Sequence, residues 1–232
     1  MKKIFNKYVV IGISCIGIFL FLLILLLTVD KKTNVEGQIG LYGFNKAFLV
    51  DRYKESWDGL SDVILYISLG FLLGLAIYGL YQLTNKKNLF KVDYDILLVG
   101  GGILIIILIW ILFDAMLIVN YRPILIDMEA SSSFPSTHVM LTTFILLSSG
   151  YCITKRESKK LIHTILGYGG FSVLVFICFL GRVLSSMHWM TDVLGGFLIG
   201  FGLFSLVVGL DKALISKERT IALETNHGNE TC

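Results

Sequence analysis

The chain has 232 residues, of which 55% are hydrophobic and 16% are charged, and its formal net charge is +3. A soluble domain of this length usually has about a quarter of its residues charged, so the composition excludes an ordinary soluble protein. The small net charge argues against a nucleic-acid-binding surface, and we expect no nucleic-acid partner. The four cysteines have no metal-type spacing, so we predict neither a zinc site nor a disulfide framework.

The apolar residues gather into six blocks, each close to the ~20 residues that span the hydrocarbon core of a bilayer. Backbone polar groups inside a bilayer must hydrogen-bond within their own segment, so each block is expected to be a helix. The first block is long enough to span and no cleavage pattern follows it, which favours a retained helix over a removed signal peptide. We predict an all-α bundle of six transmembrane helices in which residues 1–232 form one polytopic domain, with helices at about 8–29, 60–83, 96–119, 136–153, 161–180 and 191–210.

The segment 30–59 between the first two predicted helices is the longest connection. It contains Gly40, Phe44 and Trp57, and we expect part of it to lie along the membrane interface. The tail after Asp211 is polar, and we expect it to be loosely ordered.

The basic residues indicate an orientation in the membrane. Most of them lie near the two termini and in the second and fourth connections, which share one side of a six-helix bundle. Basic residues mark the cytoplasmic side, although those in segment 30–59 run against this assignment. We therefore predict a multi-pass cell-membrane protein with both termini in the cytoplasm, and with Arg122 and Arg182 facing the outside.

The third and fifth connections contain most of the residues with reactive side chains. The third carries Asn120-Tyr121-Arg122-Pro123 and Phe134-Pro135-Ser136-Thr137-His138, and the fifth carries Gly181-Arg182, His188 and Asp192. Each residue alone has an ordinary structural explanation, because histidines at span boundaries and arginines at helix ends are commonly interfacial anchors. Their convergence on one predicted face indicates a functional site.

These residue types together suit phosphate chemistry. Arg122 and Arg182 are fixed cations whose planar forks match phosphate oxygens. Ser136 and Thr137 supply donors at the expected start of the fourth helix, where the helix dipole also favours an anion. Two histidines and one carboxylate complete a set suited to phosphoryl transfer through a covalent phosphohistidine.

His188 and Asp192 are four residues apart. If the sixth helix includes both, they lie on one face, and the carboxylate holds one ring nitrogen while the other becomes more basic. His138 approaches from the other connection.

This pattern resembles the type 2 phosphatidic acid phosphatase family of membrane lipid phosphatases. The family has a six-helix topology and the motifs Lys-x6-Arg-Pro, Pro-Ser-Gly-His and Ser-Arg-x5-His-x3-Asp. The matching residues in this chain are Arg122-Pro123, Pro135-Ser136-Thr137-His138, and Gly181-Arg182 with His188 and Asp192.

The resemblance implies a role for each matching residue. His188 would attack phosphorus, Asp192 would orient it, and His138 would protonate the leaving group. Residues that would hold the phosphoryl oxygens are Arg122, Arg182, Ser136 and Thr137. The family uses no metal or other cofactor, so we expect none. Its lipid members act on phosphatidate, phosphatidylglycerol phosphate, or polyprenyl phosphates and diphosphates such as undecaprenyl diphosphate.

Three positions depart from the family pattern. Ala115 stands where the motif lysine would fall, Thr137 replaces the motif glycine, and Gly181 replaces the motif serine. We expect the adjacent Asp114 to face another way on its helix and not to substitute for the lysine. Lys54, in the first connection, is a candidate replacement cation.

Three functions remain open from the sequence. The first is a phosphatase that hydrolyses a membrane lipid phosphate or diphosphate. The second is a phosphotransferase that passes the phosphoryl group to a lipid or glycan, because water and an alcohol compete for the same second step. The third is a lipid-headgroup binder that has lost activity, but binding alone would need only the arginines.

Overall fold

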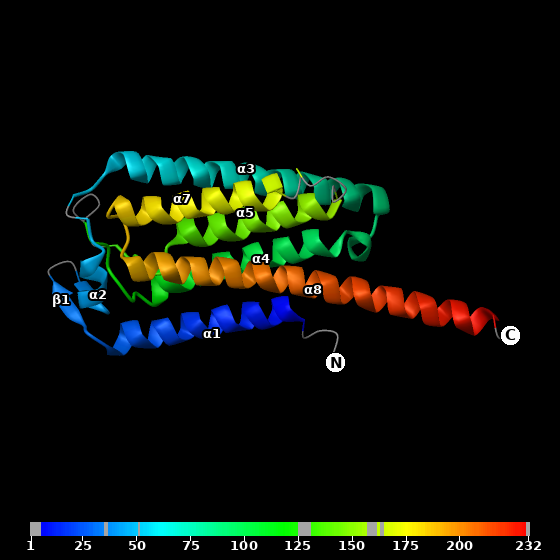
Figure 1. The fold of residues 1–232 in the computed structure, drawn as a ribbon, viewed down its shortest axis with the longest axis horizontal. Coiled ribbons are helices and arrows are strands. Elements are labelled where there is room, and N and C mark those ends of the chain that lie inside the picture. The colour runs from blue at the N-terminus through cyan, green and yellow to red at the C-terminus, as the bar shows by residue number, and fades with distance from the viewer. Residues whose placement is uncertain are drawn as a thin grey trace.

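The structure is a computed structural model that describes residues 6–34, 37–50, 52–124, 131–156, 162 and 165–230. Within these residues, six helical segments are long and apolar enough to cross a membrane. They lie roughly antiparallel, side by side, in one elongated bundle (Figure 1). The predicted all-α six-helix bundle is confirmed. Its main helices are α1 (Lys7–Thr28), α3 (Glu55–Lys86), α4 (Tyr94–Ile111), α5 (Thr137–Arg156), α7 (Phe171–Leu184) and α8 (Met190–Glu230).

Several helix bounds differ from the predicted ones, because charged residues continue a helix beyond its apolar part. α3 begins at Glu55, five residues before the predicted start, and therefore includes Asp58. α8 continues to Glu230 and projects beyond the bundle (Figure 1); its tail was expected to be loosely ordered, and this was wrong. α4 ends at Ile111 and passes into a π-helical turn, Leu112–Met116. A second π-helical segment, Ile165–Gly170, precedes α7.

The first connection folds over one end of the bundle. It contains a short hairpin, β1 (Lys32–Asn34) and β2 (Gly37–Ile39), followed by α2 (Tyr42–Ala47). Asn45 Nδ2 donates to the Gly40 carbonyl at 3.0 Å, and Thr191 N donates to Asn45 Oδ1 at 3.1 Å. These bonds tie the connection to the first turn of α8. We call this the site end; its position at a membrane interface stays a prediction.

Close helix packing positions the site end. α5 is the most buried of the six spans, and α8 crosses it through glycines. A Cβ added at Gly196 would lie 2.4 Å from the Ser136 carbonyl oxygen, and one at Gly200 would lie 2.6 Å from that of Met140. Small residues let helix backbones approach closely, so the first turns of α5 and α8 lie directly against each other.

The opposite end, where α1 begins and α5 ends, carries a buried network of charges. We call it the basic end. Arg156 Nη1 donates to Asp95 at 2.6 Å, and Lys155 Nζ donates to Asp211 at 2.8 Å. Both carboxylates are fully buried, and Tyr151 also donates to Asp211 at 2.6 Å. Buried charges need such partners because desolvation is costly, so this network joins α4, α5 and α8.

Replacing Asp95 by alanine is therefore expected to destabilise the protein. Arg156 would lose its bidentate partner and keep Asp93 as a carboxylate partner, so we expect a loss of about 1–3 kcal/mol. Thermal unfolding in detergent should show a lower midpoint. Lys217→Gln, an exposed charge change on α8, is the matched control and should stay within about 0.5 kcal/mol. Equal midpoints for the two variants would contradict a stabilising role of the network.

Candidate active site

A cavity of about 250 Å³ opens at the site end, on the side of α5 that faces α3 and α4. Of the seven residues predicted for the site, Arg122, Thr137, His138 and His188 line this cavity, whereas Ser136, Arg182 and Asp192 do not. The remaining lining residues are Leu65, Trp110, Phe113, Asp114, Ser132, Ser133, Phe134 and Pro135.

His188 is buried, and its hydrogen bond defines the tautomer of the ring. Nδ1 lies 2.9 Å from the backbone oxygen of Ser133. A carbonyl oxygen only accepts, so Nδ1 carries the proton and Nε2 keeps its lone pair. Burial, together with the positive charges of Arg182 and Arg122, lowers the pKa of His188 well below 6.5. The ring is therefore neutral at pH 7, with the free lone pair on Nε2.

The sequence predicted that Asp192 holds the ring of His188 by a direct hydrogen bond. The structure does not contain this bond. Oδ2 of Asp192 lies 3.7 Å from His188 Nδ1. The two side chains are therefore neighbours within ion-pair distance, but Nδ1 of His188 makes its hydrogen bond to the Ser133 carbonyl instead. Asp192 instead accepts from Trp189 N at 2.9 Å and from Asn120 Nδ2 at 2.9 Å.

Asp192 consequently organises the backbone around the site. Its bond to Trp189 N closes the first turn of α8, as an acidic residue at the third helical position does in a capping box. Its carbonyl oxygen accepts from Ser136 N at 2.9 Å, which links the start of α5 to the start of α8. Asn120 also accepts from Gly40 N at 2.9 Å. Asp192 thus lies in a network that fixes the segments carrying both histidines.

His138 has a carboxylate partner that no sequence motif indicated. Its Nε2 lies 2.9 Å from Asp62 Oδ1. Within the described residues no protein group hydrogen-bonds to Nδ1 of His138, so that nitrogen is the one available to a ligand. Asp62 comes from α3, and its side chain is 41% exposed.

Arg182 is paired with a second carboxylate of α3. Its side chain is only 2% exposed, and Nη1 donates to Asp58. The same nitrogen lies 3.7 Å from Asp62 Oδ1. Asp58 and Asp62 are four residues apart and therefore lie on one face of α3. That spacing, at the end of the span facing the third and fifth connections, was the available signal for both residues. Asp58 pairs with Nη1 only, and the buried Nε of Arg182 has no hydrogen-bond partner among the described residues. The phosphate contact predicted for Arg182 stays a prediction.

Arg122 supplies a cation that faces the cavity. Its backbone N donates to the Ser131 carbonyl at 3.1 Å, next to the bridge between Tyr121 and Ser132. The side-chain Nε is buried and has no hydrogen-bond partner in the described part of the chain. Burial and the charge of Arg182 lower the pKa of Arg122. An unpaired buried guanidinium donor is costly unless an anion satisfies it, which makes this cavity suited to an anionic ligand.

The two remaining predicted phosphate-binding residues lie at the start of α5. Thr137 is the first residue of the helix and lines the cavity. The hydroxyl of Ser136 is buried and has no hydrogen-bond partner among the described residues. Both therefore stay candidates for contacts with a phosphate group.

Asp114 lines the cavity, and the expectation that it faces another way was wrong. A π-helical turn places successive side chains at smaller angles than an α-helical turn does, and Asp114 lies in the turn Leu112–Met116. Ala115 is not among the lining residues. Lys54, the candidate replacement cation, lies at the start of α3 and does not line the cavity either. The described cavity thus has a carboxylate near the position where the motif supplies a lysine.

Three comparisons with known proteins concern the family and the fold of this chain. Residues 110–215 match the family model of the PAP2 superfamily. The phosphatidylglycerophosphatase B of Bacillus subtilis (strain 168) is 28% identical over 169 residues, which make up 70% of this chain and 62% of that protein. The matched region is thus less than two thirds of the relative's length. The crystal structure of a transmembrane PAP2 type phosphatidylglycerolphosphate phosphatase from Bacillus subtilis has the same fold, with a TM-score of 0.58 at 24% identity, covering 86% of this chain and 95% of that one.

Proposed function

We propose that this chain, whose residues 110–215 match the family model of the PAP2 superfamily, is a membrane lipid phosphatase that forms a covalent phosphohistidine on His188. The observation that carries the proposal is the position of Nδ1 of His188, 2.9 Å from the Ser133 carbonyl. That bond leaves Nε2 unprotonated in a cavity that His138 and Arg122 also line. A nucleophile, a proton donor and a cation thus share one small space.

The reaction proceeds in two steps. In the first, Nε2 of His188 forms a bond to phosphorus as the bond from phosphorus to the lipid oxygen breaks. His138, protonated and paired with Asp62, gives its proton to the departing oxygen, which leaves as an alcohol or, from a diphosphate, as a phosphate. In the second step His138 takes a proton from water, the water oxygen attacks phosphorus, and the bond to His188 breaks. Inorganic phosphate leaves and both histidines return to their starting states.

The positive charge for this reaction comes from the chain. Arg122 offers a buried Nε donor that lacks a partner in the described residues, and charge-assisted bonds to phosphate are about twice as strong as neutral ones. The start of α5, at Thr137, adds a helix dipole that favours an anion. Arg182 joins them if the phosphate displaces Asp58. We therefore expect hydrolysis in the presence of EDTA.

The substrate is proposed to be a lipid whose tail stays in the bilayer. Leu65, Trp110 and Phe113 form an apolar wall of the cavity and belong to α3, α4 and the turn that follows α4, which are candidate spans. Phosphatidylglycerol phosphate is the first substrate to test, because the relatives in Bacillus subtilis are named for it. Undecaprenyl diphosphate is the second. The proposed site faces the outside of the cell membrane, with both termini in the cytoplasm.

The proposal is tested by phosphate release from detergent-purified protein with EDTA present throughout. The panel contains phosphatidate, phosphatidylglycerol phosphate, a polyprenyl phosphate and a polyprenyl diphosphate. Release from at least one of them supports the phosphatase. Loss of lipid phosphate without free phosphate, restored only by a lipid or glycan alcohol, would indicate a phosphotransferase instead. Binding without turnover, by protein shown to be folded, would overturn both.

The carboxylate of Asp114 provides a further prediction. It lines the cavity beside Arg122, where its charge repels a phosphate group. We expect Asp114→Asn to lower the KM for the lipid phosphate about two- to fivefold, since an exposed charge pair contributes about 0.2–1 kcal/mol. Steady-state kinetics at two ionic strengths measure the change. Glu55→Gln removes a charge from the exposed start of α3 and should leave KM unchanged, whereas an equal effect of both variants would contradict a local role of Asp114.

A further inference from the structure

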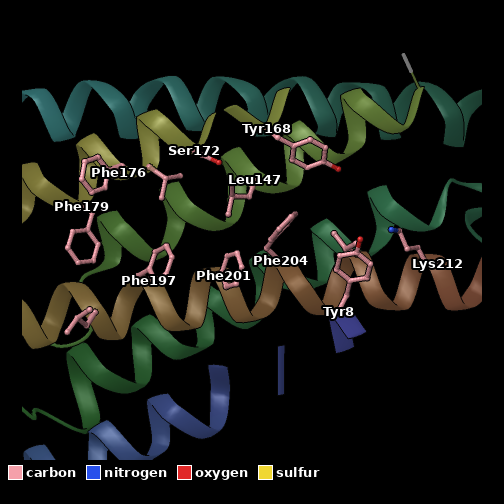
Figure 2. Close-up of a pocket in the computed structure, with 13 residues that line it drawn as sticks. Tyr8, Leu147, Tyr168, Ser172, Phe176, Phe179, Phe197, Phe201, Phe204 and Lys212 are labelled. Carbon is pink, nitrogen blue, oxygen red and sulfur yellow. The ribbon is translucent and has the colours of Figure 1, made fainter. Parts of the chain in front are cut away.

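A second cavity, of about 830 Å³, lies between α7 and α8 on the other side of α5. Figure 2 shows phenylalanine rings from both helices directed into it, with Leu147 of α5 behind them. We call this second cavity the groove. Among the described residues, none lines both the groove and the candidate active site. The lining residues are Tyr8, Leu147, Tyr168, Ser172, Val175, Phe176, Phe179, Leu194, Phe197, Phe201, Phe204, Val208 and Lys212.

The groove runs along most of the bundle. Its α8 residues recur every three or four positions from Leu194 to Lys212 and so form one face of the helix. At 1.5 Å per residue this face is about 27 Å long, close to the ~30 Å thickness of a hydrocarbon core. The volume lies within the range of roughly 300–1,000 Å³ that is usual for small-molecule sites. A long, thin, apolar ligand fits these dimensions.

Only one end of the groove is charged. Lys212 Nζ lies 4.1 Å from the ring centroid of Tyr8, and Lys7 Nζ lies 5.1 Å from the same ring. In the described part of the chain neither ammonium group forms a salt bridge, unlike Lys155 and Arg156 of the nearby network. Figure 2 places Tyr8, Tyr168 and Lys212 together at this end. The groove therefore ends in two positive charges that lack a carboxylate partner and two phenol rings.

We propose that the groove between α7 and α8 binds an acyl chain of an anionic phospholipid, whose headgroup phosphate contacts Lys212 and Lys7. The aromatic side chains contact the acyl chain in place of neighbouring lipids. The two lysines favour an anionic headgroup over a zwitterionic one. The bound lipid is not the substrate, because its phosphate lies at the basic end and the two histidines lie at the site end. The inference therefore stands independently of the proposed phosphatase activity.

The experiment places a fluorescent reporter inside the groove. Phe201→Trp is reconstituted in phosphatidylcholine vesicles that contain increasing fractions of phosphatidylglycerol with brominated chains, which quench tryptophan on contact. The signal of the unmodified protein, from Trp57, Trp110 and Trp189, is subtracted. Leu104→Trp is the matched control, because Leu104 is a 64% exposed residue of α4 away from the groove.

If the proposal is correct, the reporter at position 201 reaches half-quenching at a mole fraction about 30-fold lower than the control does, given about 1 kcal/mol for each of the two lysines near an anionic headgroup. Brominated phosphatidylcholine should show no such difference, and the double variant Lys7→Gln/Lys212→Gln should abolish it. Native mass spectrometry of the otherwise unmodified protein and of the double variant gives a second readout: retained phosphatidylglycerol in the former only.

Three outcomes would overturn the proposal. Equal quenching curves for the two reporters would mean that the groove samples bulk lipid. A preference that survives removal of both lysines would mean that the headgroup does not bind there. No quenching at position 201, with normal quenching at position 104, would mean that the groove is closed to lipid, for example by a second copy of the chain.

Discussion

Replacing His188 by alanine is expected to reduce phosphate release by on the order of 10⁴- to 10⁶-fold, as the loss of a covalent nucleophile does in well-characterised enzymes. The geometry gives the reason. The bond from Nδ1 to Ser133 directs one ring nitrogen at a backbone oxygen and leaves Nε2 as the only unprotonated nitrogen of this ring.

The activity of His188→Ala is best measured together with the phosphohistidine intermediate that this variant cannot form. Substrate labelled in the transferred phosphoryl group should leave label on the unmodified protein when the reaction is stopped with alkali, under which a phosphohistidine persists. His188→Ala should carry no label, whereas His227→Ala, near the C-terminal end of α8, should behave like the unmodified protein. Label that persists in His188→Ala would assign the nucleophile to another residue.

The pH dependence follows from the same burial. The pKa of His188 lies well below 6.5, so its neutral, nucleophilic form exists above that lowered pKa and is lost only as the pH falls through it. Protonation of the nucleophile should therefore not reduce the single-turnover rate between pH 7 and pH 6.5. A rate that falls with an apparent pKa near 6.5 or higher would have to come from another group.

The fold was predictable because hydropathy reports directly on the bilayer. Six apolar blocks became six spans, since a buried backbone in lipid has few alternatives to a helix. The ends of the helices were less predictable, because charged residues such as Asp58 and Lys86 belong to α3 but lie outside the apolar block that hydropathy detects. The π-helical turn that directs Asp114 into the cavity leaves no periodic signal in so short a segment.

The candidate site was predictable in part, because the motifs place their residues in two connections that meet at the same end of the bundle. Arg122, His138 and His188 do share one cavity. His188 and Asp192 do lie close together, 3.7 Å apart, but the predicted hydrogen bond is not made, because Nδ1 of His188 bonds to the Ser133 carbonyl. The carboxylates of α3 were missed because tertiary packing, rather than sequence proximity, brings them to the site.

Asp58 and Asp62 change the electrostatics that the motifs alone suggest. Asp58 compensates the buried charge of Arg182, and an uncompensated buried charge costs several kcal/mol. Asp62 lies within hydrogen-bonding distance of His138. Arg182 thus has a carboxylate partner at Nη1, whereas the buried Nε atoms of Arg122 and Arg182 have no hydrogen-bond partner in the described residues. A phosphate entering the cavity meets Arg122 as the open donor.

His138→Ala is expected to slow the hydrolysis of lipid phosphates about 10²- to 10⁴-fold, the usual contribution of a general acid. The size of the loss should depend on the leaving group, because an alkoxide needs a proton and a nitrophenolate scarcely does. Kinetics with the lipid phosphate and with p-nitrophenyl phosphate therefore measure the role directly. A loss of the same size for both substrates would show that His138 binds or supports the site rather than donating a proton.

Asp62→Asn should reproduce the same dependence on a smaller scale. Its oxygen lies 2.9 Å from Nε2 of His138 and stabilises the imidazolium that donates the proton, but the side chain is 41% exposed. Solvent screening therefore limits the expected loss to about tenfold with the lipid phosphate, with little change for p-nitrophenyl phosphate. In the background of His138→Ala, Asp62→Asn should have no further effect on either substrate, since the proton that Asp62 favours is no longer there. Additive losses in the double variant would instead show that Asp62 acts on Arg182 or on α3 and not through His138.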